Sequence, residues 1–134
     1  MSGEEGKTLA RRYFEEVINQ GNLAVADQIF AADYIDHSAR PGNPTGPAAV
    51  KPVIAAFRAA FHDLDETIED MVAEGDKVAL RFRAAGVHRG EFRGIAPTGR
   101  RVQWTGLAIL RVAGGKIVER WGVIDVFSIM QQLS

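Results

Sequence analysis

Apolar residues recur every three to four positions in three stretches of the first half of the chain. This spacing predicts three helices: one that ends near Gly21, a short one from Leu23 to Phe30, and one that begins at Pro47 and ends near His62. Asn22 is a suitable N-cap for the second helix, and a proline suits the first turn of the third. We expect each helix to bury one face.

The segment between the second and third helices, ADYIDHSARPGNPTGP, contains three of the five prolines of the chain. We interpret it as a loop without a regular element. It nevertheless carries Tyr34, Asp36 and His37. Polar side chains that are held in a loop on a rigid scaffold are candidates for function.

The second half of the chain changes to a period of two. Four stretches alternate or run apolar, with many β-branched residues, and they are separated by EGDK, by the residues around GIAPTG, and by AGGK: Thr67–Glu74, Val78–His88, Arg101–Val112 and Ile117–Phe127. This pattern predicts long antiparallel strands joined by hairpins. Helices followed by a bent sheet are typical of an α+β fold, and we expect one domain over residues 1–134.

Composition narrows the choice of partners. Hydrophobic residues make up 46% of the 134 residues and charged residues 25%, with a net charge of -1, so the basic surplus of a nucleic-acid-binding protein is absent. There is no cysteine, and the three histidines, His37, His62 and His88, lack metal-ligand spacing, so we expect no metal or cofactor. The N-terminal stretch lacks the pattern of a signal peptide and no run reaches membrane-spanning length, which favours a cytoplasmic protein.

The last predicted strand carries one carboxylate, Asp125, inside the apolar run WGVIDVF. Strict alternation places Asp125 on the same face as Trp121, where aromatic walls would desolvate the carboxylate and raise its pKa toward the range useful for acid/base chemistry. Alternatively, Asp125 caps a C-terminal helix, FSIMQQL, or pairs with an arginine. Alternation also aims Glu119 inward, which would require a position at the rim or a β-bulge.

Aromatic side chains are the other candidates for a pocket wall. Trp104 shares its strand face with Gly106 and Ala108, and these small residues would leave room for a cavity. His88, at the end of a strand, either faces this cavity or makes a structural hydrogen bond. The remaining aromatic candidates are either core or pocket wall: Tyr13, Tyr34, Phe57 and Phe61.

Four segments together resemble one known family: YIDH at 34–37, FHDLDETIEDMVAEGDKVALRF at 61–82, HRGEFRGIAPTGRRV at 88–102, and GGKIVERWGVIDVFSIMQQL at 114–133. In order and spacing they resemble the SnoaL-like polyketide cyclases, or ester cyclases, of the nuclear transport factor two-like superfamily. The resemblance implies a cone-shaped fold, usually dimeric, in which a curved antiparallel sheet and three N-terminal helices enclose a deep apolar pocket. It also implies that Asp125 is the acid/base residue and that His37, rather than Asp36, lies near the pocket.

The implied activity is cofactor-free ring closure of a polyketide-like substrate, a small apolar or aromatic compound, by an intramolecular aldol-type condensation. Asp125 would move the proton, while His37, His88, Trp104 and Trp121 would orient the substrate. Two alternatives stay open. One is a non-catalytic module for small-molecule binding or dimerisation; the other is a related isomerase, dehydratase or epoxide hydrolase, although alternation directs no arginine toward Asp125.

The outer face of the sheet is the candidate dimer interface. Helices are expected on the concave face only, which would leave apolar strand residues uncovered on the other face. Alternation assigns Leu107, Ile109, Val118 and Ile124 to this outer face. We therefore expect a homodimer.

Overall fold

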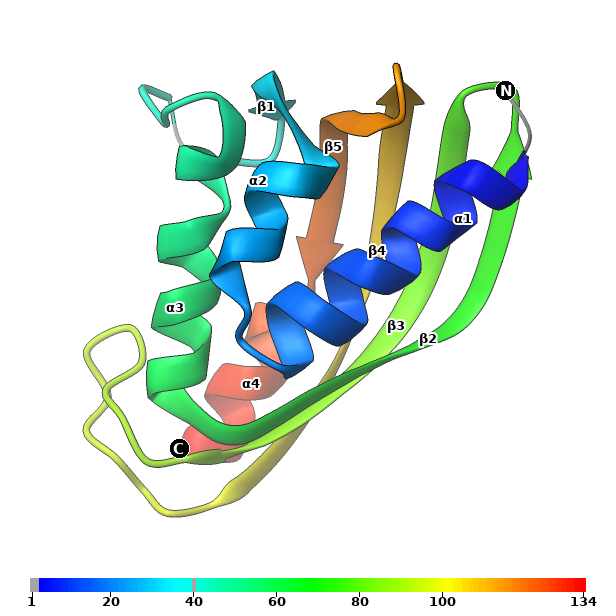
Figure 1. Ribbon diagram of the computed structural model, residues 1–134. Coiled ribbons are helices and arrows are strands. Elements are labelled where there is room, and N and C mark those ends of the chain that lie inside the picture. Colours follow the sequence, from blue (N-terminus) through cyan, green and yellow to red (C-terminus); the bar gives the residue numbers. More distant parts are fainter. Residues whose placement is uncertain (1–2, 40) are drawn as a thin grey trace.

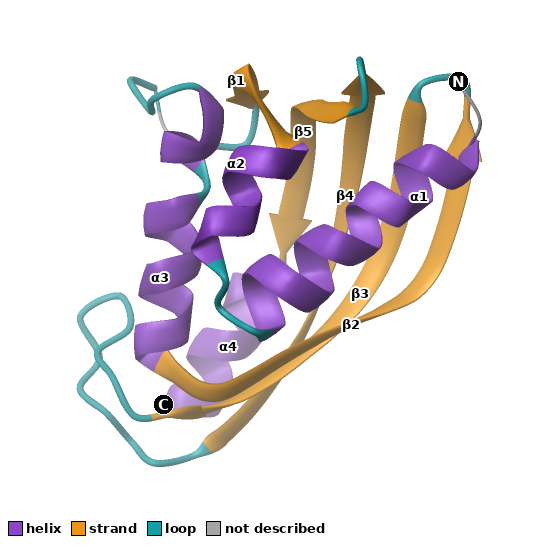
Figure 2. Cartoon of the chain, in the orientation of Figure 1, coloured by secondary structure: helices purple, strands orange, loops and turns teal. Residues whose placement is uncertain are grey.

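A bent five-stranded sheet with helices on its concave side makes up residues 3–39 and 41–134, which the computed structural model describes (Figure 1). The α+β class predicted from the sequence is therefore confirmed. The helical half of the chain forms one layer and the long strands form the other (Figure 2).

The first predicted helix is present but changes its type halfway. Helix α1 (Gly3–Arg12) continues directly into η1, a π-helix (Tyr13–Asn19). A π-helix has about one extra residue in each turn and frequently occurs at functional sites. In η1 it directs four large side chains into the interior of the protein: Tyr13, Phe14, Val17 and Ile18.

The second helix is followed by a strand that the sequence interpretation missed. A 3₁₀ turn, η2 (Leu23–Val25), and the short helix α2 (Ala26–Ile29) lead directly into β1 (Phe30–Asp36). The prediction that this segment is a loop was wrong at its start. The strand exists because β1 pairs in parallel with a strand from the far end of the chain, a contact that local sequence does not encode.

The remaining elements follow the predicted order. The turn η3 (Gly46–Ala49) and helix α3 (Lys51–Ala60) precede the antiparallel strands β2 (Phe61–Glu74), β3 (Lys77–His88), β4 (Arg101–Ala113) and β5 (Lys116–Ile124), and α4 (Val126–Leu133) ends the chain. The strand order is β1-β5-β4-β3-β2, so the sheet is mixed and has β1 and β2 at its open edges. The predicted antiparallel hairpins are confirmed; the parallel β1 is the addition.

Strands β3 and β4 alternate strictly between a buried and an exposed face. The even-numbered residues of β4 face the helices, while Leu107 and Ile109 on the outer face are 55% and 41% exposed. The prediction that these two apolar side chains lie uncovered on the outer face is confirmed.

A β-bulge in β5 inverts the alternation of that strand. Val112 of β4 pairs with Ile117, whereas the preceding Arg111 pairs with Glu119, so Val118 is an extra residue on β5. Beyond the bulge, the even-numbered residues of β5 lie opposite the buried residues of β4: Arg120, Gly122 and Ile124. The expectation from strict alternation, that Trp121 and Asp125 face the concave side and Ile124 the outer side, is therefore wrong.

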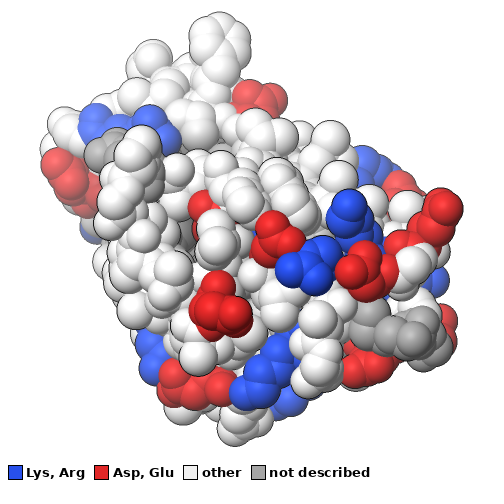
Figure 3. All heavy atoms as spheres, turned by 90° about the horizontal axis from the view of Figure 1, so that it is seen from above, with Lys and Arg blue, Asp and Glu red and all other residues white. Residues whose placement is uncertain are grey.

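Charged side chains are mixed over the surface. Seen from above, Asp and Glu lie interspersed with Lys and Arg, and neither sign covers this face continuously (Figure 3). Arg100, one of the arginines of the β3–β4 connection, donates to the carbonyl oxygens of Gln132 and Ser134 at the end of α4. Within residues 3–39 and 41–134, no helix has the length and apolar character needed to cross a membrane.

Candidate active site

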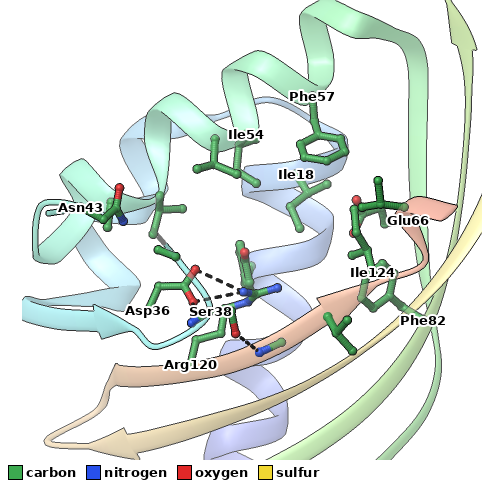
Figure 4. A pocket seen from close by; sticks show the side chains of 18 of the residues that line it. Ile18, Asp36, Ser38, Asn43, Ile54, Phe57, Glu66, Phe82, Arg120 and Ile124 are labelled. Carbon is green, nitrogen blue, oxygen red and sulfur yellow. Dashed lines mark hydrogen bonds and ion pairs between the residues drawn. The ribbon is translucent and has the colours of Figure 1, made fainter. Parts of the chain in front are cut away.

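A cavity of about 490 Å³ lies between the concave face of the sheet, η1, α3 and the segment that follows β1 (Figure 4). Its volume falls within the range of roughly 300–1,000 Å³ that is usual for small-molecule sites. Most of its wall is apolar, with residues contributed by helices and strands: Ile18, Val50, Ile54, Leu64, Phe82 and Ile124. Such a wall suits a hydrophobic or aromatic ligand.

Four of the aromatic residues proposed from the sequence lie on this wall: Tyr13, Tyr34, Phe57 and Trp104. Another, Phe61, has no exposed surface and packs behind the wall, with its ring centroid 4.9 Å from that of Trp104 and 6.3 Å from that of Phe57. Gly106, which we expected to leave room for the cavity, instead accommodates the ring of Phe82, because a Cβ at Gly106 would lie 2.4 Å from that ring.

An ion pair crosses the cavity wall where β1 meets β5. Asp36 and Arg120 are register partners, and the Nη1 atom of Arg120 lies 3.2 and 3.3 Å from the two carboxylate oxygens of Asp36 (Figure 4). Both side chains are only 17% exposed. Among the described residues, the Nε atom of Arg120 has no hydrogen-bond partner. The guanidinium therefore has an N–H group that can donate a hydrogen bond to a further acceptor.

The backbone beside this pair is shaped to hold the guanidinium. A Cβ at Gly122 would lie 2.4–2.9 Å from atoms of the Arg120 guanidinium, so a glycine at this position leaves the space that the guanidinium occupies. The N–H group of Gly122 donates to the Oγ atom of Ser38 over 2.6 Å. This contact fastens the segment after β1 to β5 and keeps Asp36 beside Arg120.

Two phenol groups and the guanidinium share the same region of the cavity. Burial raises the pKa of Tyr13 and of Tyr34, so both hydroxyls stay protonated at neutral pH. Burial opposes the charge of Arg120, but Tyr13, Asp36 and Tyr34 together raise its pKa above the ordinary value. The region therefore offers a fixed positive charge and two hydroxyl donors to an oxygen atom of a ligand.

Glu66 of β2 is the titratable group that stands out in the cavity. Its side chain is half-buried and lines the wall together with Ile18 and Leu64 (Figure 4). Burial raises the pKa of this carboxyl to about 7, although Arg120 lowers it in part. A carboxyl group with this pKa exists in both protonation states near neutral pH, which suits a general acid/base.

Asp125 lies in a different place from the one predicted. It is exposed, and its Oδ1 atom accepts a hydrogen bond from the N–H group of Ser128 over 3.0 Å, which makes it the N-cap of α4. It borders a groove on the outer face, together with Leu107 and Val123. The position favours the alternative interpretation of Asp125 as a helix cap.

His37 and Trp121 form a cluster that does not line the cavity. The His37 ring stacks on Trp121 with a centroid separation of 4.7 Å, and its Nε2 atom lies 2.6 Å from the Oε2 atom of Glu119. Arg111 donates to the same carboxylate, and Arg111 and His37 lower the pKa of Glu119. Glu119, expected at a rim or a bulge, lies directly beside the bulge.

His88 is fully buried at the end of β3. Its Nδ1 atom accepts from the N–H group of Thr98 over 3.2 Å and lies 3.0 Å from the Oγ1 atom of the same residue. Because Nδ1 accepts, we assign the ring proton to Nε2. His88 thus ties the β3–β4 connection to the sheet, which favours the structural alternative over a pocket role.

Two charged residues of the cavity, Glu66 and Arg120, were missed by sequence reasoning. Glu66 lies two positions after Leu64 and two before Ile68, so a carboxylate between two apolar residues of one strand face was a signal that could have identified it. Arg120 gave no such signal, because only the bulge brings it to the concave face. In the part of the chain that the structure describes, no group of three or more His, Asp or Glu side chains could hold a metal ion.

Comparisons with known proteins agree on one family and one fold. The family model described as SnoaL-like polyketide cyclase matches residues 8–133. Among solved structures, IdmH from Streptomyces antibioticus, a proposed polyketide cyclase, is 33% identical, with a TM-score of 0.81 over 97% of this chain and 98% of its own. AclR from Streptomyces galilaeus, a proposed hydroxylase, is 32% identical, with a TM-score of 0.86 over 98% and 97%.

A third similar structure supports the fold alone. TsrD from Streptomyces laurentii is 23% identical, with a TM-score of 0.91 over 100% of this chain and 98% of its own. No protein among those with curated descriptions matches the sequence.

Proposed function

This chain belongs to the SnoaL-like polyketide cyclase family, and from that premise and the contents of the cavity we propose that it closes a ring in a polyketide-like substrate, with Glu66 as the acid/base group. The reaction is an intramolecular aldol-type condensation of an ester or another β-dicarbonyl compound. It needs no cofactor, because the adjacent carbonyl groups already acidify the C–H bond that must lose its proton.

The observation that carries this proposal is the position of Glu66. It combines a raised pKa of about 7 with an apolar cavity wall and a cationic Arg120 in the same cavity. A carboxylate in such a site is a stronger base than an exposed one, and it is still deprotonated in about half of the molecules at neutral pH.

The reaction proceeds in three steps that balance without an oxidant or a reductant. The Glu66 carboxylate removes a proton from the carbon between two carbonyl groups, which leaves an enolate. The enolate carbon forms a new carbon–carbon bond with a ketone carbon of the same molecule, and the π electrons of that carbonyl move to its oxygen. The resulting alkoxide takes the proton back from Glu66, so the product is an isomer of the substrate.

Arg120, Tyr13 and Tyr34 stabilise the oxygen on which negative charge develops. Donors that are already oriented in a water-poor site are worth more to a transition state than the same donors in water. Arg120 is held by Asp36, and its Nε atom, which has no partner among residues 3–39 and 41–134, can donate to a further acceptor. The apolar wall folds the flexible substrate into a reactive conformation.

The acid/base role of Asp125 and the orienting roles of His37 and His88 remain predictions from the sequence. The capping contact of Asp125 and the contacts of the two histidines support structural roles for all three. The cytoplasmic location and the homodimer also stay predictions.

Proton exchange tests the first step of the proposed reaction, removal of the C–H proton by Glu66. The purified protein is mixed with a β-diketone in heavy water, and loss of the acidic C–H signal is followed by NMR. We expect exchange above the background rate for the wild type and for Glu74→Gln, whose exposed carboxylate lies at the other end of the same strand. Glu66→Gln should lose the roughly 10²- to 10⁴-fold contribution of a general base.

The same assay separates the other interpretations. Background exchange by the wild type would overturn the proposal and leave a non-catalytic binding module and epoxide hydrolysis as the alternatives. Loss of exchange in Asp125→Asn, with Glu66→Gln unaffected, would assign the chemistry to Asp125 instead.

A second candidate function is epoxide hydrolysis. That reaction uses two carboxylates around an arginine, and the bulge brings Arg120 into one cavity with Asp36 and Glu66. One carboxylate would take a proton from water as the water oxygen attacks an epoxide carbon, while the epoxide oxygen takes a proton from the other acid. Conversion of an aryl epoxide to a diol, with the diol oxygen derived from labelled water, would establish this activity.

A further inference from the structure

The side chain of Asn19, in the helical layer, forms hydrogen bonds with the main chain of Glu66. The Nδ2 atom of Asn19, the last residue of η1, donates to the carbonyl oxygen of Glu66 over 2.9 Å, and the Glu66 N–H group donates to Oδ1 of Asn19 over 2.7 Å. These two bonds are the kind that a neighbouring strand would make. Because β2 is an edge strand, Asn19 takes the place of that neighbour.

Asn19 is itself fixed from a third element. The Nη1 atom of Arg58, on α3, donates to the carbonyl oxygens of Ile18 and Asn19 over 2.8 and 2.7 Å. The chain turns immediately afterwards at Gly21, where φ is +71° and a Cβ would collide with the Arg58 guanidinium. Helix α3, the π-helix and β2 are therefore joined at one point beside the cavity.

The ladder between β2 and β3 is irregular on both sides of Glu66. Its register shifts between His62 and Asp65, and again between Ile68 and Asp70. The short regular stretch that carries Glu66 is thus isolated from the rest of the strand, so support from the free edge matters more than it would in a continuous ladder.

We infer that Asn19 is a positioning residue, which holds the main chain of Glu66 so that the carboxyl group stays inside the cavity near Arg120. This inference rests on the proposed role of Glu66. The π-helix contributes to this role, because it places Asn19 level with Glu66 and also directs Tyr13 into the cavity.

Loss of the two bonds should change the protonation of Glu66. A second groove, of about 480 Å³, lies on the other side of Asn19 and Glu66, between the first helix and β2. Without Asn19, the edge strand can relax toward this groove, and the carboxyl gains water. Less desolvation lowers the pKa of a carboxyl.

The other groups that act on the carboxyl remain in place. Arg120 faces it from β5, Tyr13 from η1, and Asp65 adjoins it on β2. The groove also carries three charged residues from α1 and η1: Lys7, Arg11 and Glu15. Since none of these is altered by a substitution at Asn19, a changed titration of Glu66 would report the change in its position.

The test is an NMR titration of protein labelled with ¹³C at the glutamate carboxyl groups, with the Glu66 signal assigned by its absence in Glu66→Gln. In Asn19→Ala we expect the Glu66 midpoint to fall by about one pH unit or more. Asn22→Ala is the matched control, because Asn22 is exposed in the next turn and its side chain makes no capping bond. Its midpoint should equal that of the wild type.

A merely structural role would give a different result. If Asn19→Ala melts at a lower temperature but keeps the wild-type midpoint, Asn19 only supports the fold and the inference is wrong. Should Asn19→Ala fail to fold, Asn19→Gln offers the same groups on a longer arm, and it should displace the midpoint while the protein remains folded.

The titration requires no substrate, so its outcome is independent of the proton-exchange assay. If the wild type fails to catalyse exchange while Asn19→Ala moves the midpoint, the proposed function fails and the positioning role stands. If the wild type catalyses exchange, Asn19→Ala should lower kcat more than it changes KM, and it should move the acidic limb of the pH–rate profile to lower pH.

Discussion

Replacement of Glu66 by glutamine removes a charge that the cavity disfavours. Folding raises the pKa of this carboxyl from 4.5 to about 7. Each tenfold change in proton affinity corresponds to about 1.36 kcal/mol, so the ionised carboxylate costs the folded state up to about 3 kcal/mol. Glutamine has nearly the same shape and no charge. We therefore expect Glu66→Gln to be more stable than the wild type while it loses activity.

The gain in stability should depend on pH in a defined direction. Below about pH 4.5, Glu66 is protonated in both the folded and the unfolded state, and the two proteins should be about equally stable. Between about pH 4.5 and 7 the unfolded wild type releases a proton that the folded wild type retains, so wild-type stability falls as the pH rises. Above about pH 7 the difference reaches its full value.

Urea unfolding at pH 4 and pH 8 measures this difference. At pH 8, about 3 kcal/mol corresponds to an increase in the melting temperature of the order of 10 °C for a domain of this size. Glu74→Gln removes an exposed carboxylate from the same strand and should change the free energy of unfolding by less than about 1 kcal/mol at either pH. An equal effect of Glu66→Gln at both pH values would refute the reasoning, because desolvation of the charge would then not be its cause.

Three further substitutions test other parts of the structure. Asp125→Ala should lower the free energy of unfolding by about 1 kcal/mol through loss of the helix cap, with proton exchange unchanged; normal stability without exchange would contradict this. Gly122→Ala should displace the Arg120 guanidinium from Asp36, so that ligand binding weakens by about tenfold or more and the melting temperature falls, and calorimetry would show both changes. Leu107→Asp should convert a homodimer into a 14.6 kDa monomer in light scattering, and a wild type that is already monomeric would exclude this interface.

The sequence predicted elements well wherever local pattern and tertiary contacts agree. Residues 78–88 and 101–112 lie in the middle of the sheet with a covered and an uncovered face, so their alternation predicts both the strand and the side. Residues 30–36 form a strand through a parallel pairing with residues more than 80 positions away, and nothing in the adjacent proline-rich segment indicates that pairing.

The candidate site was predicted less well, for a related reason. The aromatic wall follows from helix and strand periodicity, and Tyr13, Phe57 and Trp104 lie on it. The polar groups depend on single-residue geometry. The bulge directs Arg120 inward and leaves Asp125 outside, and the sequence KIVERWGVID does not indicate where an extra residue is accommodated.

The extra residue at Val118 determines which side chains in the rest of β5 face the concave side of the sheet. Deletion of one residue there would restore strict alternation with β4, so that Trp121 would turn toward the concave face and Arg120 and Gly122 would turn away from it. A change of one residue in strand length would thus replace several side chains of the cavity wall at once, without any substitution. On this scaffold, a one-codon insertion or deletion would be a shorter evolutionary route to a new specificity than a series of point mutations.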